Sequence, residues 1–304
     1  MINPLISLEV NVRRFLALCA GVMLAATAAF GQTPSASPIT ALIRCDDAGM
    51  CHAVNMALQE IVDRQIPVSI SVMTPCPWFE EAADILRNAP HVSLGIHLTL
   101  NAEWKHYRWG PVLGAAAVPS LVDSSGNFMP SRALFFAHHP KPDEVERELR
   151  AQIDRALLAG LRIDYLDYHM GTAVDNPEMR AIVEKLAAEY HVAISRYFGE
   201  QDIEGFYQAA PAAKIDTLVD RVNGFRPGPV RLLVFHVGLE TPEMNALVDL
   251  NTFGLPEMSK YRNAERGALL SDAFREALAR NGIRLVTYRD LVSERGLGAM
   301  KRPE

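Results

Sequence analysis

The sequence predicts an α/β fold, an irregular or incomplete (β/α) TIM-like barrel built as a single domain. Short apolar runs alternate with amphipathic segments of helical period along most of the chain, a pattern typical of parallel sheets. About seven such runs in one domain favour a closed or nearly closed barrel. Polar residues also interrupt these runs near their C-terminal ends, where barrel enzymes carry their reactive groups.

The first part of the chain is expected to be a cleaved leader. Two arginines precede the apolar run 15–30, and small and polar residues follow it, which is the organisation of a secretory signal peptide. We therefore assign residues 1–31 to a signal peptide, 32–38 to a linker and 39–304 to the barrel domain. The apolar run is short for a membrane-spanning helix, so we expect no stable membrane anchor and a periplasmic or secreted protein.

Composition narrows the class of partner. The 304 residues carry a formal net charge of −6 at pH 7, which argues against nucleic acid as a partner because phosphates would be repelled.

Three cysteines follow the leader, Cys45, Cys51 and Cys76, and their spacing is not that of a zinc site. We expect Cys45 and Cys76 to be small buried residues. Whether a disulfide forms among the three, and whether the protein is a homodimer, is left open.

The individual elements follow from periodicity and from turn residues. Apolar and β-branched runs predict strands at 39–45, 68–73, 92–100, 162–169, 192–196, 230–238 and 283–288. Helical period predicts helices at 53–65, 78–88, 142–160, 176–190, about 212–222 and 263–282. Pro142 and Gly160 bracket the longest of the central helices. A region rich in Pro and Gly, 101–140, separates the third strand from that helix.

Two adjacent carboxylates, Asp46 and Asp47, end the first predicted strand. Side chains alternate along a strand, so the two should point in different directions and serve different tasks. An alternative is that both are loop residues that cap the following helix. Further polar residues stand within or at the end of later strands; these are His97, Asp167, His169 and His236. Each needs a partner or a metal ion in an apolar setting, although a lone histidine is often satisfied by one hydrogen bond.

One aspartate and two imidazoles form a typical open site for a catalytic divalent metal ion, with room for water. Metal-bound water becomes a nucleophile near neutral pH, and a neighbouring carboxylate can accept its proton. This division of labour explains the adjacent pair: one aspartate holds the metal ion and the other is the base.

Four motifs also carry a family resemblance. The stretches "DDAGMCHAVNMAL", "GIHLTL", "LDYHMGT" and "YRNAERGALLSDAFREALARNGIRLVTYRDL" resemble the YdjC/ChbG family of carbohydrate deacetylases of the chitooligosaccharide type, over residues 39–291. The resemblance implies an irregular barrel that removes acetyl groups from N-acetylated sugars. It implies that a Mg or Zn ion is bound by Asp47, His97 and His169. It further implies that Asp46 is the general base and that His236 is the acid that protonates the leaving amine.

The sequence departs from the family pattern at two places. Many members read D-S-H-x-H where this chain has "DYHMG", so Gly171 replaces the second histidine. Many members also read H-P-G where this chain has "HVG" at 236–238. The "HMGT" variant, together with "EWKHYRWGP" at 103–111, resembles a secreted branch of the family.

The segment "EWKHYRWGP" is a candidate sugar groove. Aromatic faces can stack on sugar rings while charged groups orient hydroxyls, so we expect substrate contacts from Glu103, Trp104, Arg108 and Trp109. The alternative is a long loop that its aromatic residues pin to the barrel.

Three functions are consistent with these patterns. The leading hypothesis is a metal-dependent hydrolase that removes acetyl groups from N-acetylated sugars or oligosaccharides by means of metal-activated water. The same ligands would support a hydrolase of another amide or a phosphoester. A non-catalytic periplasmic sugar-binding protein is the third, but Asp46 beside a complete ligand set argues against it, because binding alone needs no base.

Overall fold

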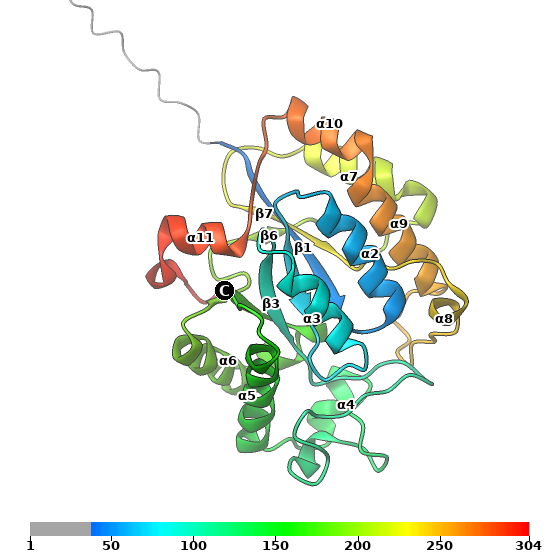
Figure 1. The fold of residues 1–304 in the computed structure, drawn as a ribbon, viewed down its shortest axis with the longest axis vertical. Coiled ribbons are helices and arrows are strands. Elements are labelled where there is room, and N and C mark those ends of the chain that lie inside the picture. Colours follow the sequence, from blue (N-terminus) through cyan, green and yellow to red (C-terminus); the bar gives the residue numbers. More distant parts are fainter. Residues whose placement is uncertain (1–37, 304) are drawn as a thin grey trace, which may run out of the picture. The chain divides into compact units, whose positions relative to one another are not determined.

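A computed structural model describes residues 38–303 of the chain, and they form a parallel sheet covered by helices (Figure 1). The strand order is β5-β4-β3-β2-β1-β7-β6, and β8 pairs with the beginning of β1. All the pairings are parallel. The predicted signal peptide and nearly all of the predicted linker lie outside the described residues.

The strands are short, and most of their residues are buried. Their bounds are β1 (Thr40–Ala48), β2 (Ser69–Val72), β3 (Ser93–Leu98), β4 (Tyr165–Tyr168), β5 (Ala193–Ile194), β6 (Gln201–Asp202), β7 (Arg231–Phe235) and β8 (Arg284–Val286). The helices are α2 (His52–Asp63), α3 (Phe79–Arg87), α4 (Arg132–Ala137), α5 (Pro142–Leu158), α6 (Pro177–Tyr190), α7 (Lys214–Asn223), α8 (Pro242–Asn245), α9 (Met258–Leu270), α10 (Asp272–Arg280) and α11 (Tyr288–Arg295).

The sheet is an open, incomplete barrel. Its two end strands are β5 and β6, and no ladder joins them within residues 38–303. Helix α2 packs on β1, α5 on β3 and α6 on β4, so helices cover the sheet as in βα units. Figure 1 shows α2 and α3 in front of the strands that they follow. The α/β barrel-like class expected from the sequence is therefore confirmed, and the closed version of it is wrong.

Two element boundaries differ from the sequence predictions in an informative way. Strand β1 continues through both aspartates to Ala48 instead of ending before them. The predicted single helix at 263–282 is two helices, because Ser271 has extended ψ (145°) and its side chain accepts a hydrogen bond from the Phe274 N–H of α10. A serine that caps a new helix in this way outweighs the continuous helical periodicity on either side of it.

The three cysteines are buried and free. Burial raises the pKa of the Cys51 thiol to about 11, and it raises the pKa values of Cys45 and Cys76 well above their usual range. The interpretation of Cys45 and Cys76 as small core residues is confirmed.

Among residues 38–303, none of the helices is both long enough and apolar enough to cross a bilayer.

Candidate metal centre and active site

The end of β1 turns the two aspartates toward different partners. The register between β1 and β2 shifts between Cys45 and Ala48, and Asp47 has a positive φ of 66°. Such a bulge re-aims side chains, and the left-handed backbone is uncommon for a residue other than glycine. Helix α2 begins at His52 after Cys51, which makes no side-chain cap. The alternative in which both aspartates cap this helix is therefore wrong.

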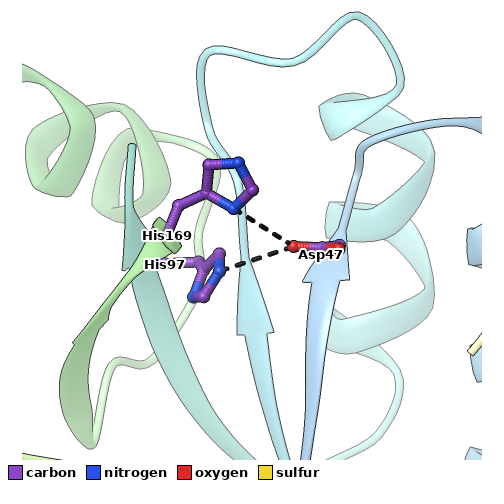
Figure 2. A group of neighbouring side chains, drawn as sticks. All are labelled: Asp47, His97 and His169. Atoms are coloured by element: carbon purple, nitrogen blue, oxygen red, sulfur yellow. Dashed lines mark ion pairs between the residues drawn. The ribbon is translucent and has the colours of Figure 1, made fainter. Parts of the chain in front are cut away.

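Asp47, His97 and His169 converge on one point (Figure 2). Asp47 Oδ1 lies 3.4 Å from His97 Nε2 and 3.5 Å from His169 Nδ1. All three side chains are buried, and one ligand atom from each lies within 4.8 Å of the others. His97 belongs to β3 and His169 follows β4 directly, so the meeting of three strand ends brings the group together. Asp47 Oδ1 is buried and has only these two long imidazole contacts among the described residues, which leaves it able to bind a ligand.

The other carboxylate oxygen of Asp47 is fixed by an arginine. Arg262 Nη2 donates to Asp47 Oδ2 at 2.7 Å. Burial by itself would raise the pKa of Asp47, but Arg262 and the two imidazoles hold it well below its usual range. The result is an ionised carboxylate with one oxygen anchored and one free, beside two imidazole nitrogens. This donor set fits a divalent metal ion and leaves positions for water and substrate.

A carboxylate stands behind each imidazole. Asp167 Oδ2 lies 3.0 Å from His97 Nδ1, and Glu103 Oε2 lies 3.0 Å from His169 Nε2. Burial alone would lower the pKa values of both imidazoles, but the neighbouring carboxylates outweigh it. Asp167 above all raises the pKa of His97 to about 10. Glu103 above all raises the pKa of His169 to about 9. A metal ion held at Nδ1 of His169 would require that nitrogen to be unprotonated, so the ring proton would then lie on Nε2 and be donated to Glu103. Such carboxylate–histidine pairs orient the rings of metal ligands.

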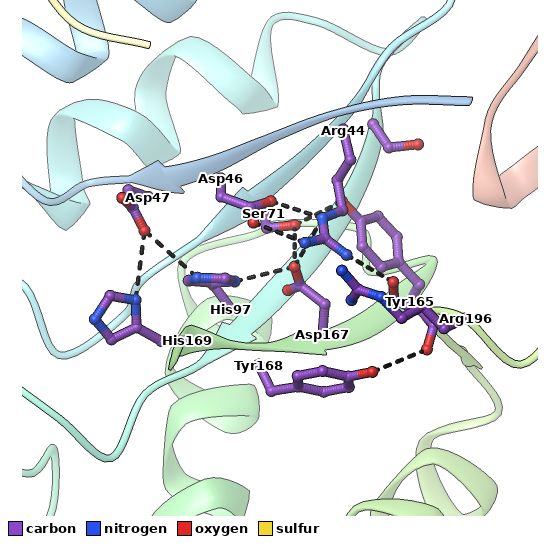
Figure 3. Close-up of polar contacts among 12 residues, drawn as sticks. Arg44, Asp46, Asp47, Ser71, His97, Tyr165, Asp167, Tyr168, His169 and Arg196 are labelled. Carbon is purple, nitrogen blue, oxygen red and sulfur yellow. Dashed lines mark hydrogen bonds and ion pairs between the residues drawn. The ribbon is translucent and has the colours of Figure 1, made fainter. Parts of the chain in front are cut away.

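Asp46 occupies a separate position beside the donor set (Figure 3). Arg44, two residues earlier on the same side of β1, donates from Nε to Asp46 Oδ1 and from Nη2 to Oδ2, each at 2.7 Å. Burial would raise the pKa of Asp46, but Arg44 first and then His97 lower it below its usual value. Each carboxylate oxygen keeps a lone pair that can accept a further proton or hydrogen bond. His236 Nε2 lies 3.9 Å from Asp46 Oδ2.

A second convergent group, Asp46, His97 and Asp167, is a poorer metal site. Its ligand atoms also lie within 4.8 Å of one another. Arg44 Nε, however, lies 2.7 Å from Asp46 Oδ1 and 3.1 Å from Asp167 Oδ2. A guanidinium already neutralises these carboxylates and would repel a cation placed between them.

The three candidate ligands, Asp46 and His236 line one cavity of about 410 Å³, but the predicted sugar-groove residues divide between two locations. Glu103 and Trp104 line the cavity. Arg108 instead donates to Asp123 and to the Phe128 carbonyl, and Trp109 is 3% exposed and donates to the Asn101 carbonyl. Neither lines the cavity, and their contacts fit the alternative of a loop pinned to the barrel.

Three charged residues around the site were not singled out from the sequence; they are Arg44, Arg262 and Glu265. Asp167 was singled out as a polar residue at a strand end, and the structure gives it His97 and Arg44 as partners. Arg44 carried a signal, because a charged residue within an apolar strand needs a partner and the residue two positions later points the same way. Arg262 and Glu265 come from a helix remote in sequence, and nothing in the local pattern of that helix points to β1 or β7.

The Glu103–His169 pair leads to a prediction. We expect Glu103→Ala to weaken divalent metal affinity about 10- to 100-fold, because the imidazole loses the group that orients it and fixes its tautomer. Glu103→Gln, which keeps an acceptor oxygen, should lose less. Glu144→Ala is the matched control, since Glu144 is equally buried but accepts a hydrogen bond from the Ser120 N–H away from the cavity. Chelator competition measures the affinities, and equal values for the Glu103 and Glu144 variants would contradict the prediction.

Comparison with known proteins decides the family. Residues 40–280 match the model of the YdjC-like protein family. The chain belongs to this family. The matched YdjC-like region includes the donor set and Asp46, His236, Arg262 and Glu265.

Two relatives of this YdjC-like chain are named carbohydrate deacetylase. The Brevibacillus brevis protein is 34% identical over 164 residues, which cover 53% of this chain and 61% of the relative. The alignment therefore spans less than two thirds of that protein. The Geobacillus stearothermophilus protein is 26% identical over 263 residues, covering 83% of this chain and 98% of the relative.

A solved structure from Enterococcus faecalis V583, described as a cellobiose-phosphate cleavage protein, shares the fold. It has a TM-score of 0.69 and 24% identity, and the superposition covers 84% of this chain and 99% of that one.

Proposed function

We propose that this chain is a metal-dependent carbohydrate deacetylase that hydrolyses the N-acetyl group of N-acetylated sugars or oligosaccharides. The observation that carries the proposal is the separation of tasks at the end of β1: Asp47 faces two imidazoles, while Asp46 stands outside that set with His236 Nε2 at 3.9 Å. A protein that only bound sugars would need neither a carboxylate oxygen turned toward two imidazoles nor a second carboxylate beside it. The names of the YdjC-like relatives support the same reaction class.

The residues of the chain divide the reaction into two proton transfers. Asp47, His97 and His169 would hold the metal ion, of which Mg and Zn are the candidates, and the ion would supply polarisation of the acetyl carbonyl and acidification of water. Asp46 accepts the proton of the attacking water, and Arg44 keeps that carboxylate ionised and in place. His236 donates a proton to the amine nitrogen as the C–N bond breaks, which releases acetate and a free amino sugar.

The test is acetate release. The purified protein, loaded in turn with Mg²⁺ and Zn²⁺, is incubated with N-acetylated mono- and oligosaccharides, and acetate and free amine are measured together. We expect equal amounts of both, lost after chelation and restored by metal. Hydrolysis of simple phosphoesters or other amides without any acetate from these sugars would contradict the proposal.

We also propose that the protein is exported and works in the periplasm or outside the cell. The twin arginines, the apolar run 15–30 and the small residues after it support this location. The mature chain should begin close to Gln32. N-terminal sequencing of protein recovered from the cell envelope or medium checks this, and a chain that still begins at Met1 would contradict it.

A further inference from the structure

Helix α9 presents two buried charged residues to the active site, one turn apart. Arg262 anchors Asp47, as described above. Glu265, only 1% exposed, lies on the same side of the helix. Its Oε2 accepts a hydrogen bond from the His236 backbone N–H at 2.7 Å, and its Oε1 accepts one from Lys214 Nζ at 2.8 Å.

Lys214 is fully buried, and all three of its ammonium hydrogens have acceptors. Besides Glu265, these are the backbone carbonyls of Phe206 at 2.8 Å and Tyr207 at 2.9 Å. The rings of Tyr207 and His236 contact each other edge to face, with centroids 5.3 Å apart, and both line the cavity. The Lys214–Glu265 pair therefore joins α7 and α9 to the backbone at 206–207 and at His236, two segments of one cavity wall.

The position of His236 in the fold explains why it needs such an anchor. The ladder between β1 and β7 ends at the pairing of Cys45 with Phe235, the residue just before His236. Beyond that point the sheet no longer fixes the backbone, and Glu265 provides the acceptor for the next N–H. A buried ion pair can often be replaced by apolar residues of similar volume without loss of stability. Stability alone is therefore a weak explanation for the presence of the Lys214–Glu265 pair.

We propose that the Lys214–Glu265 pair is a positioning device for His236. The inference rests on the proposed function, in which His236 donates a proton to the leaving amine. Glu265 acts through the His236 backbone and touches no reacting atom. Arg262, on the same helix, acts on the metal ligand instead, so α9 holds both halves of the site through two separate contacts.

The test compares two side chains at position 265 in a Lys214→Met background. Glu265→Gln keeps an oxygen that can accept the His236 N–H, whereas Glu265→Met has similar length and no such acceptor. Neither variant leaves a buried charge without its partner. We expect equal metal affinities, a slightly lower melting temperature with Met because the His236 N–H loses its acceptor, and a kcat for N-acetyl sugars about 10- to 100-fold lower with Met than with Gln. Equal kcat values for the two would overturn the inference.

A substrate whose leaving group needs no proton from His236 distinguishes a loss of His236 positioning from a general distortion of the active site. A nitrophenyl acetate releases a stable anion, so its hydrolysis should be the same in the Gln and Met variants. In a His236→Ala background the difference between Gln and Met on sugars should disappear, because the positioned group is gone. A loss that is equal on both substrates, or that persists without His236, would overturn the inference.

One readout does not depend on sugar turnover. The ring resonances of His236, identified by their loss in His236→Ala, should differ between the Gln and Met variants, while those of His97 and His169 stay the same. If the wild-type protein released no acetate, the proposed function would fail and these resonances would still decide whether Glu265 positions His236. Identical His236 resonances in the two variants would count against the inference.

Discussion

The Asp46→Asn protein should keep its metal ion and lose about 10²- to 10⁴-fold of its turnover, the usual contribution of general acid–base catalysis. Asn has the same shape as Asp but cannot accept the proton of the attacking water. The ligand atoms of Asp47, His97 and His169 do not include Asp46, so metal affinity should change little. Arg44 keeps Asp167 at 3.1 Å and Ser195 at 2.6 Å, so it retains two of its partners.

The matched control for this change is Asp202→Asn. Asp202 also lines the cavity, but its carboxylate pairs with Arg196, at 2.7 Å from Nη2 and 2.8 Å from Nε, and takes no part in the proposed reaction. Metal content, melting temperature and acetate release are measured for both variants. Near-normal turnover of Asp46→Asn, or equal losses of turnover in Asp46→Asn and Asp202→Asn, would show that Asp46 is not the general base.

Local sequence patterns predicted the elements better than they predicted the sheet. The strands and helices follow from apolar period and from caps such as Pro142, because these are local properties. Barrel closure depends on whether the two edge strands, here β5 and β6, pair with each other, which no local pattern records. Strand β6 has only two residues, Gln201 and Asp202, both exposed, so it lacks the apolar run that would have predicted it.

At the site, too, local sequence predicted the candidate ligands and the base but not the distant residues that hold them in place. The four residues Asp46, Asp47, His97 and His169 stood out because each interrupts an apolar run near a strand end, and parallel strands bring their C-terminal ends together. The groups that anchor them come from elsewhere. Arg262 lies 215 residues from Asp47 in sequence and Glu103 lies 66 residues from His169, so only the fold makes them partners.

Loss of a direct ligand should have the largest effect on the metal ion. His169→Ala is expected to leave the purified protein without bound metal, a greater loss than the roughly 10- to 100-fold weakening expected for the carboxylates behind the imidazoles. The fold should survive, because His169 stands at the rim where strands end. His52→Ala is the control, since His52 is an exposed histidine paired with Glu81.

Asp47→Asn should fail in a related but distinguishable way. The amide can still offer one oxygen to the metal ion, so excess metal should partly restore acetate release, which it should not do for Asp46→Asn. Arg262 would then face a neutral partner, and its Nε and Nη1 already lack partners among the described residues. A buried guanidinium without its carboxylate is costly, so the melting temperature should fall more for Asp47→Asn than for His169→Ala. Elemental analysis after dialysis decides the assignment: full metal occupancy in His169→Ala or in Asp47→Asn would exclude that residue as a ligand.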